Sequence, residues 1–205
     1  MIEPRIESDR LVLRLARADD VPAIIRYYRE NEVHLAPYDP LKPANFYTEP
    51  YWAARVRHSL DEFRDGRAMR TFLFAKAAPT TVIGTISLSA ILRGPAQYAN
   101  LGYSLAESAQ GRGHMTEILP ELIAYAFGPL ELHRIQANYM PHNVRSGKLL
   151  RRLGFVVEGY ARDYLMIAGK WEDHVLTSLT NPDWTGYVRP NRPTKIPPAA
   201  PQMLL

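Results

Sequence analysis

The sequence predicts one mixed α/β domain, in which helices cover both faces of a mixed sheet. Segments rich in β-branched and aromatic residues alternate with amphipathic helical segments along the chain. The 205 residues are enough to bury the core of one large domain. The composition, with 46% hydrophobic and 22% charged residues, is typical of a globular protein and excludes a disordered or fibrous chain.

The first half of the chain predicts four strands and two helices. The first helix follows an acidic residue that can cap it, Asp19 or Asp20, and runs to about residue 29. The second helix covers about residues 50–66, where apolar side chains recur at steps of three and four. Pro79 marks a hairpin turn between the second and third strands. The four strands are expected at residues 11–15, 71–77, 81–89 and 97–105.

The second half continues the alternation. A glycine-rich turn leads into a helix that ends at Phe127 and carries one apolar stripe. Residues 144–153 form the last predicted helix. The strands of this half are expected at residues 134–139, 155–164 and 170–179, and the last two turn near residues 168–169.

The two ends of the chain differ from its middle. The N-terminus is charged and lacks the apolar stretch of a signal peptide, and no segment approaches the ~18 apolar residues of a membrane span. The absence of Cys excludes disulfides and a cysteine nucleophile, and with the other signs it predicts a cytoplasmic location. We expect a domain over residues 1–184 and a Pro-rich basic tail over residues 185–205, mobile or draped over the surface.

The segment of residues 102–116 carries the strongest chemical signal. A strand runs into a turn that contains Gly111 and Gly113, and the turn opens an amphipathic helix. Free backbone N–H groups at a helix start, where glycines permit close approach, form an anion site that suits phosphate. The same glycines can also serve only to turn the chain. The pattern matches neither a Walker A loop nor the full dinucleotide-binding motif.

Positive charge downstream favours the anion site. Residues 133–157 contain no acid and five basic side chains, and the tail adds three more, although the net charge of the chain is only +4. A solvated basic face is the alternative, but a ligand with several phosphates explains both the turn and the charge. The five basic residues are Arg134, Arg145, Lys148, Arg151 and Arg152.

These residues resemble the acetyl-CoA-binding core of the GNAT acyltransferases. The resemblance rests on the run Gln110-Gly-Arg-Gly113 before a helix and a strand, and on Asn143-Val-Arg-Ser146 at the start of the next helix. Further runs, such as Glu158-Gly-Tyr-Ala161, are similar to the RimJ-type ribosomal-protein-alanine N-acetyltransferases. The resemblance extends to Trp184 and covers nearly the whole chain before the tail.

The resemblance implies a GNAT fold with seven strands, splayed open between the fourth and fifth, here residues 97–105 and 134–139. Acetyl-CoA would lie in this gap, with its pantetheine arm along the edge of the fourth strand and its pyrophosphate on the turn amides. The resemblance implies no metal, and the His residues do not have the spacing of metal ligands. The residues implied to bind acetyl-CoA are Ser104, Leu105, Gln110, Gly111, Arg112, Gly113, His114, Met115, Thr116, Asn138, Asn143 and Lys148.

The resemblance also implies direct acetyl transfer to an amine, without an acyl-enzyme. Ser146 would donate to the leaving thiolate, with helix capping or a phosphate contact as the alternative role. The usual Glu before the strand end is replaced by Ala99 and Asn100. We therefore favour Asp163 as the proton acceptor, because strand alternation groups it with core residues and predicts partial burial with a raised pKa. Glu158 and a water chain are the alternatives.

The implied acceptor is the N-terminal α-amine of a protein such as a ribosomal protein. A small-molecule amine acetyltransferase and a non-catalytic, acetyl-CoA-responsive ribosome-associated factor are the alternatives. We expect Tyr38, Tyr51 and Glu158 to contact the acceptor. Any RNA contact would come from the basic tail, and a dimer is compatible with the resemblance.

Overall fold

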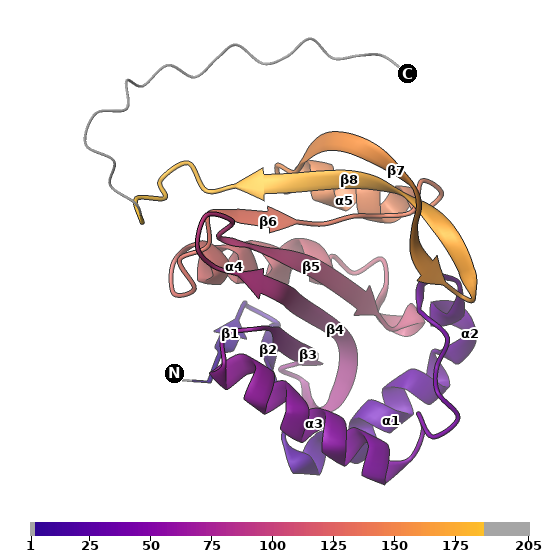
Figure 1. Ribbon diagram of the computed structural model, residues 1–205. Coiled ribbons are helices and arrows are strands. Elements are labelled where there is room, and N and C mark those ends of the chain that lie inside the picture. The colour runs from indigo at the N-terminus through magenta and orange to yellow at the C-terminus, as the bar shows by residue number, and fades with distance from the viewer. Residues whose placement is uncertain (1–2, 187–205) are drawn as a thin grey trace, which may run out of the picture.

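The computed structural model describes residues 3–186, in which eight strands form one mixed sheet with helices on both faces (Figure 1). The strand order is β1-β2-β3-β4-β5-β6-β8-β7. The strands are β1 (Arg5–Glu7), β2 (Leu11–Leu15), β3 (Met69–Ala75), β4 (Ala78–Leu92), β5 (Tyr98–Leu105), β6 (Arg134–Gln136), β7 (Val156–Ile167) and β8 (Lys170–Thr180). The helices are α1 (Val21–Glu30), α2 (Glu32–Leu35), α3 (Glu49–Arg64), α4 (His114–Phe127) and α5 (Val144–Arg152).

The mixed α/β class and all seven predicted strands are confirmed. The eighth strand, β1, was not predicted, because its three residues place only Ile6 in the core, opposite Leu13 of β2. The hairpin turn between β3 and β4 lies at residues 76–77, so the prediction of a turn at Pro79 is wrong by about two residues. Residues 187–205, which contain most of the predicted tail, lie outside the described residues.

The predicted cap of α1 has a different role. Asp20 occupies the N-cap position, but its carboxylate makes no capping bond to the helix. It accepts from the Arg17 backbone N–H at 2.7 Å and pairs with the Arg14 guanidinium at 2.6 Å. Both side chains of the ion pair are more than 80% buried. The acid therefore ties β2 to the start of α1.

The predicted gap opens between β5 and β6. The two strands pair in parallel over three residues only, from Tyr98 opposite Arg134 to Asn100 opposite Gln136. Beyond that point the chain after β6 follows β8, where Tyr139 bridges Val175. The rest of β5, up to Leu105, keeps β4 on one edge and has no partner strand among the described residues on the other.

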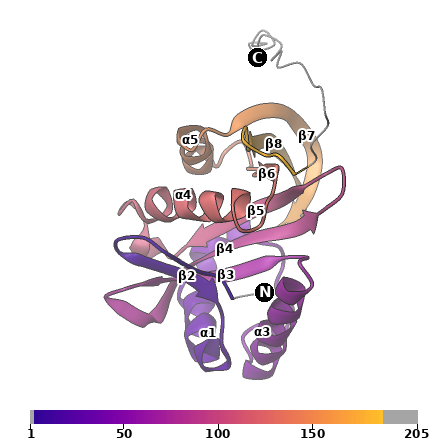
Figure 2. The same ribbon diagram turned by 90° about the vertical axis from the view of Figure 1, so that its left-hand side faces the viewer.

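The helices divide between the two faces of the sheet. Figure 2 shows α1 and α3 on one face, and α4 and α5 on the other. Side chains of β4 alternate accordingly: Ile86 and Leu88 are buried in the core beneath α4, whereas Thr85 and Ser87 face α3. An aromatic cluster that includes Trp52 fills the space beneath α1 and α3. No helix within residues 3–186 is long and apolar enough to cross a membrane.

Candidate active site

The turn before α4 has the geometry of an anion site. Gly111 and Gly113 have left-handed backbones, with φ of 73° and 78°, which favour glycine. The backbone N–H groups of residues 111–116 donate to no acceptor in the described chain. No atom lies within 4 Å of the position that a Cβ would take on Gly111. Six amides without an acceptor therefore lie at the N-terminus of α4, with open space at Gly111, and this arrangement fits a pyrophosphate.

Side chains of the turn divide into buried and exposed groups. Met115 is buried in the core, so it can contribute only its amide to an anion. His114 is partly buried, and its Nδ1 has no hydrogen-bond partner. Burial and the nearby Arg10 charge lower the pKa of His114, which favours the neutral ring. Arg112 and Thr116 are exposed beside the turn, and their contacts to acetyl-CoA stay predictions.

A carboxylate that the sequence analysis missed holds this turn. Glu117 of α4 accepts from Ser8 Oγ at 2.6 Å and from Arg10 Nε at 2.7 Å. Arg10 Nη2 also donates to the Arg112 carbonyl at 3.0 Å. Burial acts to raise the pKa of Glu117, but the bonds from Ser8 and Arg10 lower it to about 2. The loop between β1 and β2 is thus fixed to the anion turn.

Gln110 joins the turn to two helices. Its Oε1 accepts from Arg145 Nη1 of α5 at 2.5 Å, and its Nε2 lies 2.8 Å from His34 Nε2 of α2. Gln110 therefore positions the turn. The sequence could not show this role, because His34 and Arg145 are far from Gln110 along the chain. Lys148 is exposed on α5, and its phosphate contact stays a prediction.

A hydroxyl pair lies in the gap between β5 and α5. Ser146 Oγ lies 2.7 Å from the Tyr103 hydroxyl. Asn143 caps α5, because its Oδ1 accepts from the Ser146 backbone N–H at 3.2 Å. The capping role considered for Ser146 thus belongs to Asn143, which leaves the Ser146 hydroxyl in the gap. Burial raises the pKa of Tyr103, so its hydroxyl keeps its proton.

Ser104 faces the other side of β5. Its Oγ lies 2.8 Å from the Tyr27 hydroxyl of α1 and 2.7 Å from Thr85 Oγ1 of β4. Its side chain is therefore engaged with α1 and β4, and a contact from Ser104 or Leu105 to the donor would come from the open backbone edge of β5. Tyr27 and Thr85 were not found from the sequence, because Tyr27 lies 77 residues from Ser104.

Asn138 and Glu158 tie the outer strands together. Asn138 Oδ1 accepts from the Thr177 N–H, and its Nδ2 donates to the Tyr164 hydroxyl, both at 3.3 Å. Glu158 pairs with Arg134 and accepts from Ser178 Oγ. Arg134 belongs to the closed end of the gap, where β5 and β6 are still paired. The position of Glu158 therefore does not support its predicted contact with the acceptor.

Asp163, the acid favoured as proton acceptor, lacks the predicted surroundings, and the alternative, Glu158, has a lowered pKa. Asp163 is exposed, so the expected partial burial is wrong. Register shifts after Val157 and after Ala161 break the strand alternation on which that expectation rested, and Asp163 itself has a φ of 46°. Partial burial of Glu158 acts to raise its pKa, but hydrogen bonds from Arg134 and Ser178 hold it below the ordinary value.

A third acid, Asp39, lies in the loop before α3. Its side chain is 26% exposed, and its carboxylate lies 3.7 Å from Lys42 Nζ. Its backbone carbonyl accepts from the Ala168 N–H at the β7–β8 turn, which places the loop against the outer strands. Burial raises the pKa of Asp39, and Lys42 offsets part of this effect. The charge of Asp39 acts on Tyr27, the partner of Ser104.

The two aromatic residues expected at the acceptor differ in position. Tyr38 is 41% exposed and lies against the His142 ring, with 6.3 Å between the ring centres, so it faces the start of α5. Tyr51 packs edge-on against Trp52 in the aromatic cluster. Among residues 3–186, no group of three or more His, Asp or Glu side chains could hold a metal ion.

The chain is similar to known acetyltransferases over most of its length. Residues 10–156 match the family model described as "Acetyltransferase (GNAT) domain". The chain is 44% identical to the [ribosomal protein uS5]-alanine N-acetyltransferase of Escherichia coli, over 88% of this chain and 93% of that protein.

Two solved structures share the fold. The ribosomal-protein-S5-alanine acetyltransferase of Vibrio fischeri superposes with a TM-score of 0.84 and 37% identity, covering 89% of this chain and 99% of that one. Mycobacterium smegmatis RimJ in complex with CoA-disulfide superposes with a TM-score of 0.78 and 26% identity, covering 87% of this chain and 86% of that one.

Proposed function

The chain belongs to the GNAT acetyltransferase family, and from that premise we propose that it transfers the acetyl group of acetyl-CoA to the N-terminal α-amine of a ribosomal protein. One observation carries the proposal: β5 and β6 separate after three residue pairs, and the Tyr103–Ser146 pair lies in the gap that opens there. The 44% identity to a uS5-alanine N-acetyltransferase supports this acceptor class.

The residues around the gap fit acetyl-CoA. The free amides of residues 111–116 bind the pyrophosphate, and the open edge of β5 near Ser104 and Leu105 pairs with the pantetheine arm. Basic side chains of α5, such as Lys148, add positive charge beside the phosphates. Acetyl-CoA supplies an activated thioester, and the chain binds and orients it.

Two groups of the chain assist the transfer. The Ser146 hydroxyl, held by Tyr103, donates a hydrogen bond to the leaving sulfur and keeps its proton, so that it stabilises the negative charge of the thiolate. The incoming α-ammonium group, with a pKa of about 8, must lose a proton before it can attack. We assign that proton to the Asp39 carboxylate in place of Asp163, because Asp39 is partly buried and Asp163 is exposed.

The relatives support a cytoplasmic location, where ribosomal proteins are made. The predicted RNA contact falls on the tail, of which residues 187–205 lie outside the described residues, and the dimer stays a prediction from the sequence.

An acetylation assay tests the proposal. The full chain is incubated with acetyl-CoA and a panel of peptides that begin with Ala or Ser, and mass spectrometry locates the acetyl group. We expect transfer to the α-amine, with release of the CoA thiol. Acetylation confined to lysine side chains or to small amines would contradict the protein-terminus acceptor. Acetyl-CoA binding without any turnover would favour the non-catalytic alternative. Ser146→Ala should lower kcat while the Kd for acetyl-CoA stays the same.

A further inference from the structure

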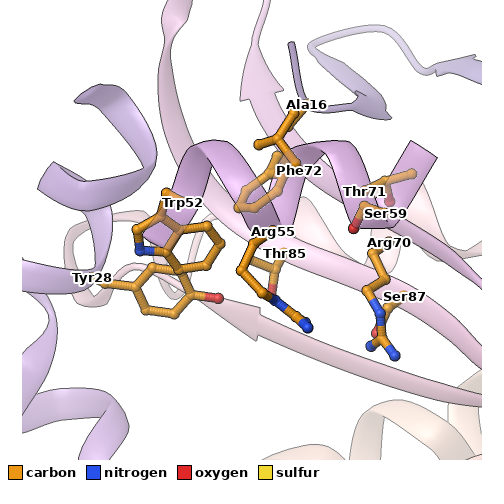
Figure 3. A pocket seen from close by; sticks show the side chains of 11 residues that line it. Ala16, Tyr28, Trp52, Arg55, Ser59, Arg70, Thr71, Phe72, Thr85 and Ser87 are labelled. Atoms are coloured by element: carbon orange, nitrogen blue, oxygen red, sulfur yellow. The ribbon is translucent and has the colours of Figure 1, made fainter. Parts of the chain in front are cut away.

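A groove of about 130 Å³ lies between α3 and the sheet, on the face opposite α4 (Figure 3). We call it the Arg55 groove and define it by Tyr28, Trp52, Arg55, Arg70, Thr85 and Ser87. Figure 3 shows Arg55 between the stacked Tyr28–Trp52 pair and Arg70. Phe72, Val56 and Ala16 also line the groove, and Thr85 and Ser87 of β4 contribute hydroxyl groups to it.

The polarity of the floor is unusual for a sheet face covered by helices. Arg70 of β3 stands opposite Ser87 of β4, and Thr85 is the next residue of β4 on the same face. The opposite face of β4, with Ile86 and Leu88, is fully buried and apolar. Packing alone would favour apolar side chains on both faces. The hydroxyl groups and guanidinium groups therefore indicate a ligand with polar or charged groups.

The groove has an excess of one positive charge. Arg70 donates to Glu62 at 2.8 Å, which neutralises it. Arg55 makes no ion pair and no hydrogen bond with any described residue, and its charge acts at longer range on Glu62. Trp52 Nε1 is buried, in a residue only 7% exposed, and it also lacks a hydrogen-bond partner. Buried donors without acceptors are costly, and together with a free guanidinium they call for an acceptor of negative charge.

The groove begins next to the open end of β5. Thr85 Oγ1, in its floor, lies 2.7 Å from Ser104 Oγ, and Ser87 is two residues further along β4. Two residues of a strand span about 7 Å, which is also the length of two residues of an extended peptide. A peptide with its amine near Ser104 would thus bring its second to fourth residues past Thr85, Ser87 and Arg55.

We propose that the Arg55 groove binds an acidic side chain of the acceptor protein, two to four residues after the acetylated residue. This inference rests on the proposed function, because it takes the open end of β5 as the place of transfer. It assigns to Arg55 a role in acceptor specificity, apart from acetyl-CoA binding and proton transfer.

Peptide binding tests the inference. Three hexapeptides carry Glu at position two, three or four, and a parent peptide carries Gln at all three. Calorimetry on the full chain saturated with CoA measures each Kd, and thiol release measures kcat/KM. We expect at least one Glu peptide to bind roughly five- to thirtyfold more tightly than the parent, as a charge-assisted bond predicts. Arg55→Ala should abolish this difference, and Arg55→Lys should restore part of it.

Arg57→Ala is the matched control, because Arg57 is exposed on the same helix and does not line the groove. It should keep the preference for Glu. Equal Kd values for all four peptides, or a preference that survives Arg55→Ala in a folded protein, would overturn the inference. Transfer to the α-amine without a preference for Glu would refute the groove alone. A preference for Glu in binding, without any transfer, would refute the proposed function and leave the groove assignment intact.

Discussion

Glu117→Gln tests how the loop between β1 and β2 supports the anion turn. The carboxylate is 19% exposed and accepts from Ser8 and Arg10, which lower its pKa from 4.5 to about 2 against the opposing effect of burial. At full value this shift corresponds to about 3 kcal/mol of folding stability. Solvent screening of a partly exposed pair reduces the expected loss in the variant to about 1–2 kcal/mol.

The effect should depend on pH in a defined direction. A carboxylate with a lowered pKa stabilises the folded state above its unfolded pKa of 4.5, and this stability is lost as pH falls toward 2. Urea unfolding at pH 7 and at pH 3 should therefore show a smaller difference between wild type and variant at pH 3. The Kd for acetyl-CoA should also rise, because Arg10 binds both Glu117 and the Arg112 carbonyl.

Glu121→Gln is the control, since Glu121 is exposed one turn further along α4. It should change neither stability nor binding. A loss in Glu117→Gln that is equal at both pH values would refute the role of the ionised carboxylate. Unchanged binding of acetyl-CoA in a destabilised variant would show that the loop stabilises the fold without positioning the turn.

Three further predictions concern the site. Gly113→Ala forces Ala into a left-handed backbone at φ 78°, which costs roughly 1–2 kcal/mol. Calorimetry should show weaker binding of acetyl-CoA to this variant. Gly159→Ala, at an open strand position, should leave the binding unchanged. Ser146→Ala should lower kcat roughly 100- to 10,000-fold. Adding Tyr103→Phe should cost little more, because the two hydroxyls act as one pair, and additive losses would contradict this. Asp39→Asn should lower kcat/KM most at pH values below about 8, where the α-amine is protonated and needs an acceptor for its proton. Asp163→Asn should leave kcat/KM unchanged.

The sequence predicted the anion turn because its determinants are local. Two glycines in the left-handed region and a following helix are all that the free amides require, and all of them lie within a few residues. The hydroxyl and carboxylate partners could not be found in this way. Tyr103 meets Ser146 across 43 residues, and Tyr27 meets Ser104 across 77. Each is an ordinary core tyrosine in the sequence.

The error over Asp163 has a physical cause. Alternation along a strand predicts burial only while the register is regular. In β7 one shift precedes Asp163 and a second, between Ala161 and Leu165, spans it. β7 is also the edge of the sheet, where side chains such as Tyr160 and Met166 are about half exposed. Pattern alone therefore overstates burial there. Asp39 lies in a connection that the sequence gives no reason to place against the outer strands, and its carbonyl contact with Ala168 of the β7–β8 turn shows that it lies there.

Two neighbouring residues of α5 lie against opposite sides of the gap. Ser146 contacts Tyr103 of β5, while Gly147 lies against Tyr139 so closely that a Cβ would meet the ring at 2.7 Å. Tyr139 is held to β8 through its bridge to Val175. One turn of helix thus contacts both sides of the gap, and the missing side chain of Gly147 lets α5 approach the outer strands. The sequence Ser146-Gly147 therefore couples the position of the hydroxyl to the separation of β5 from β8.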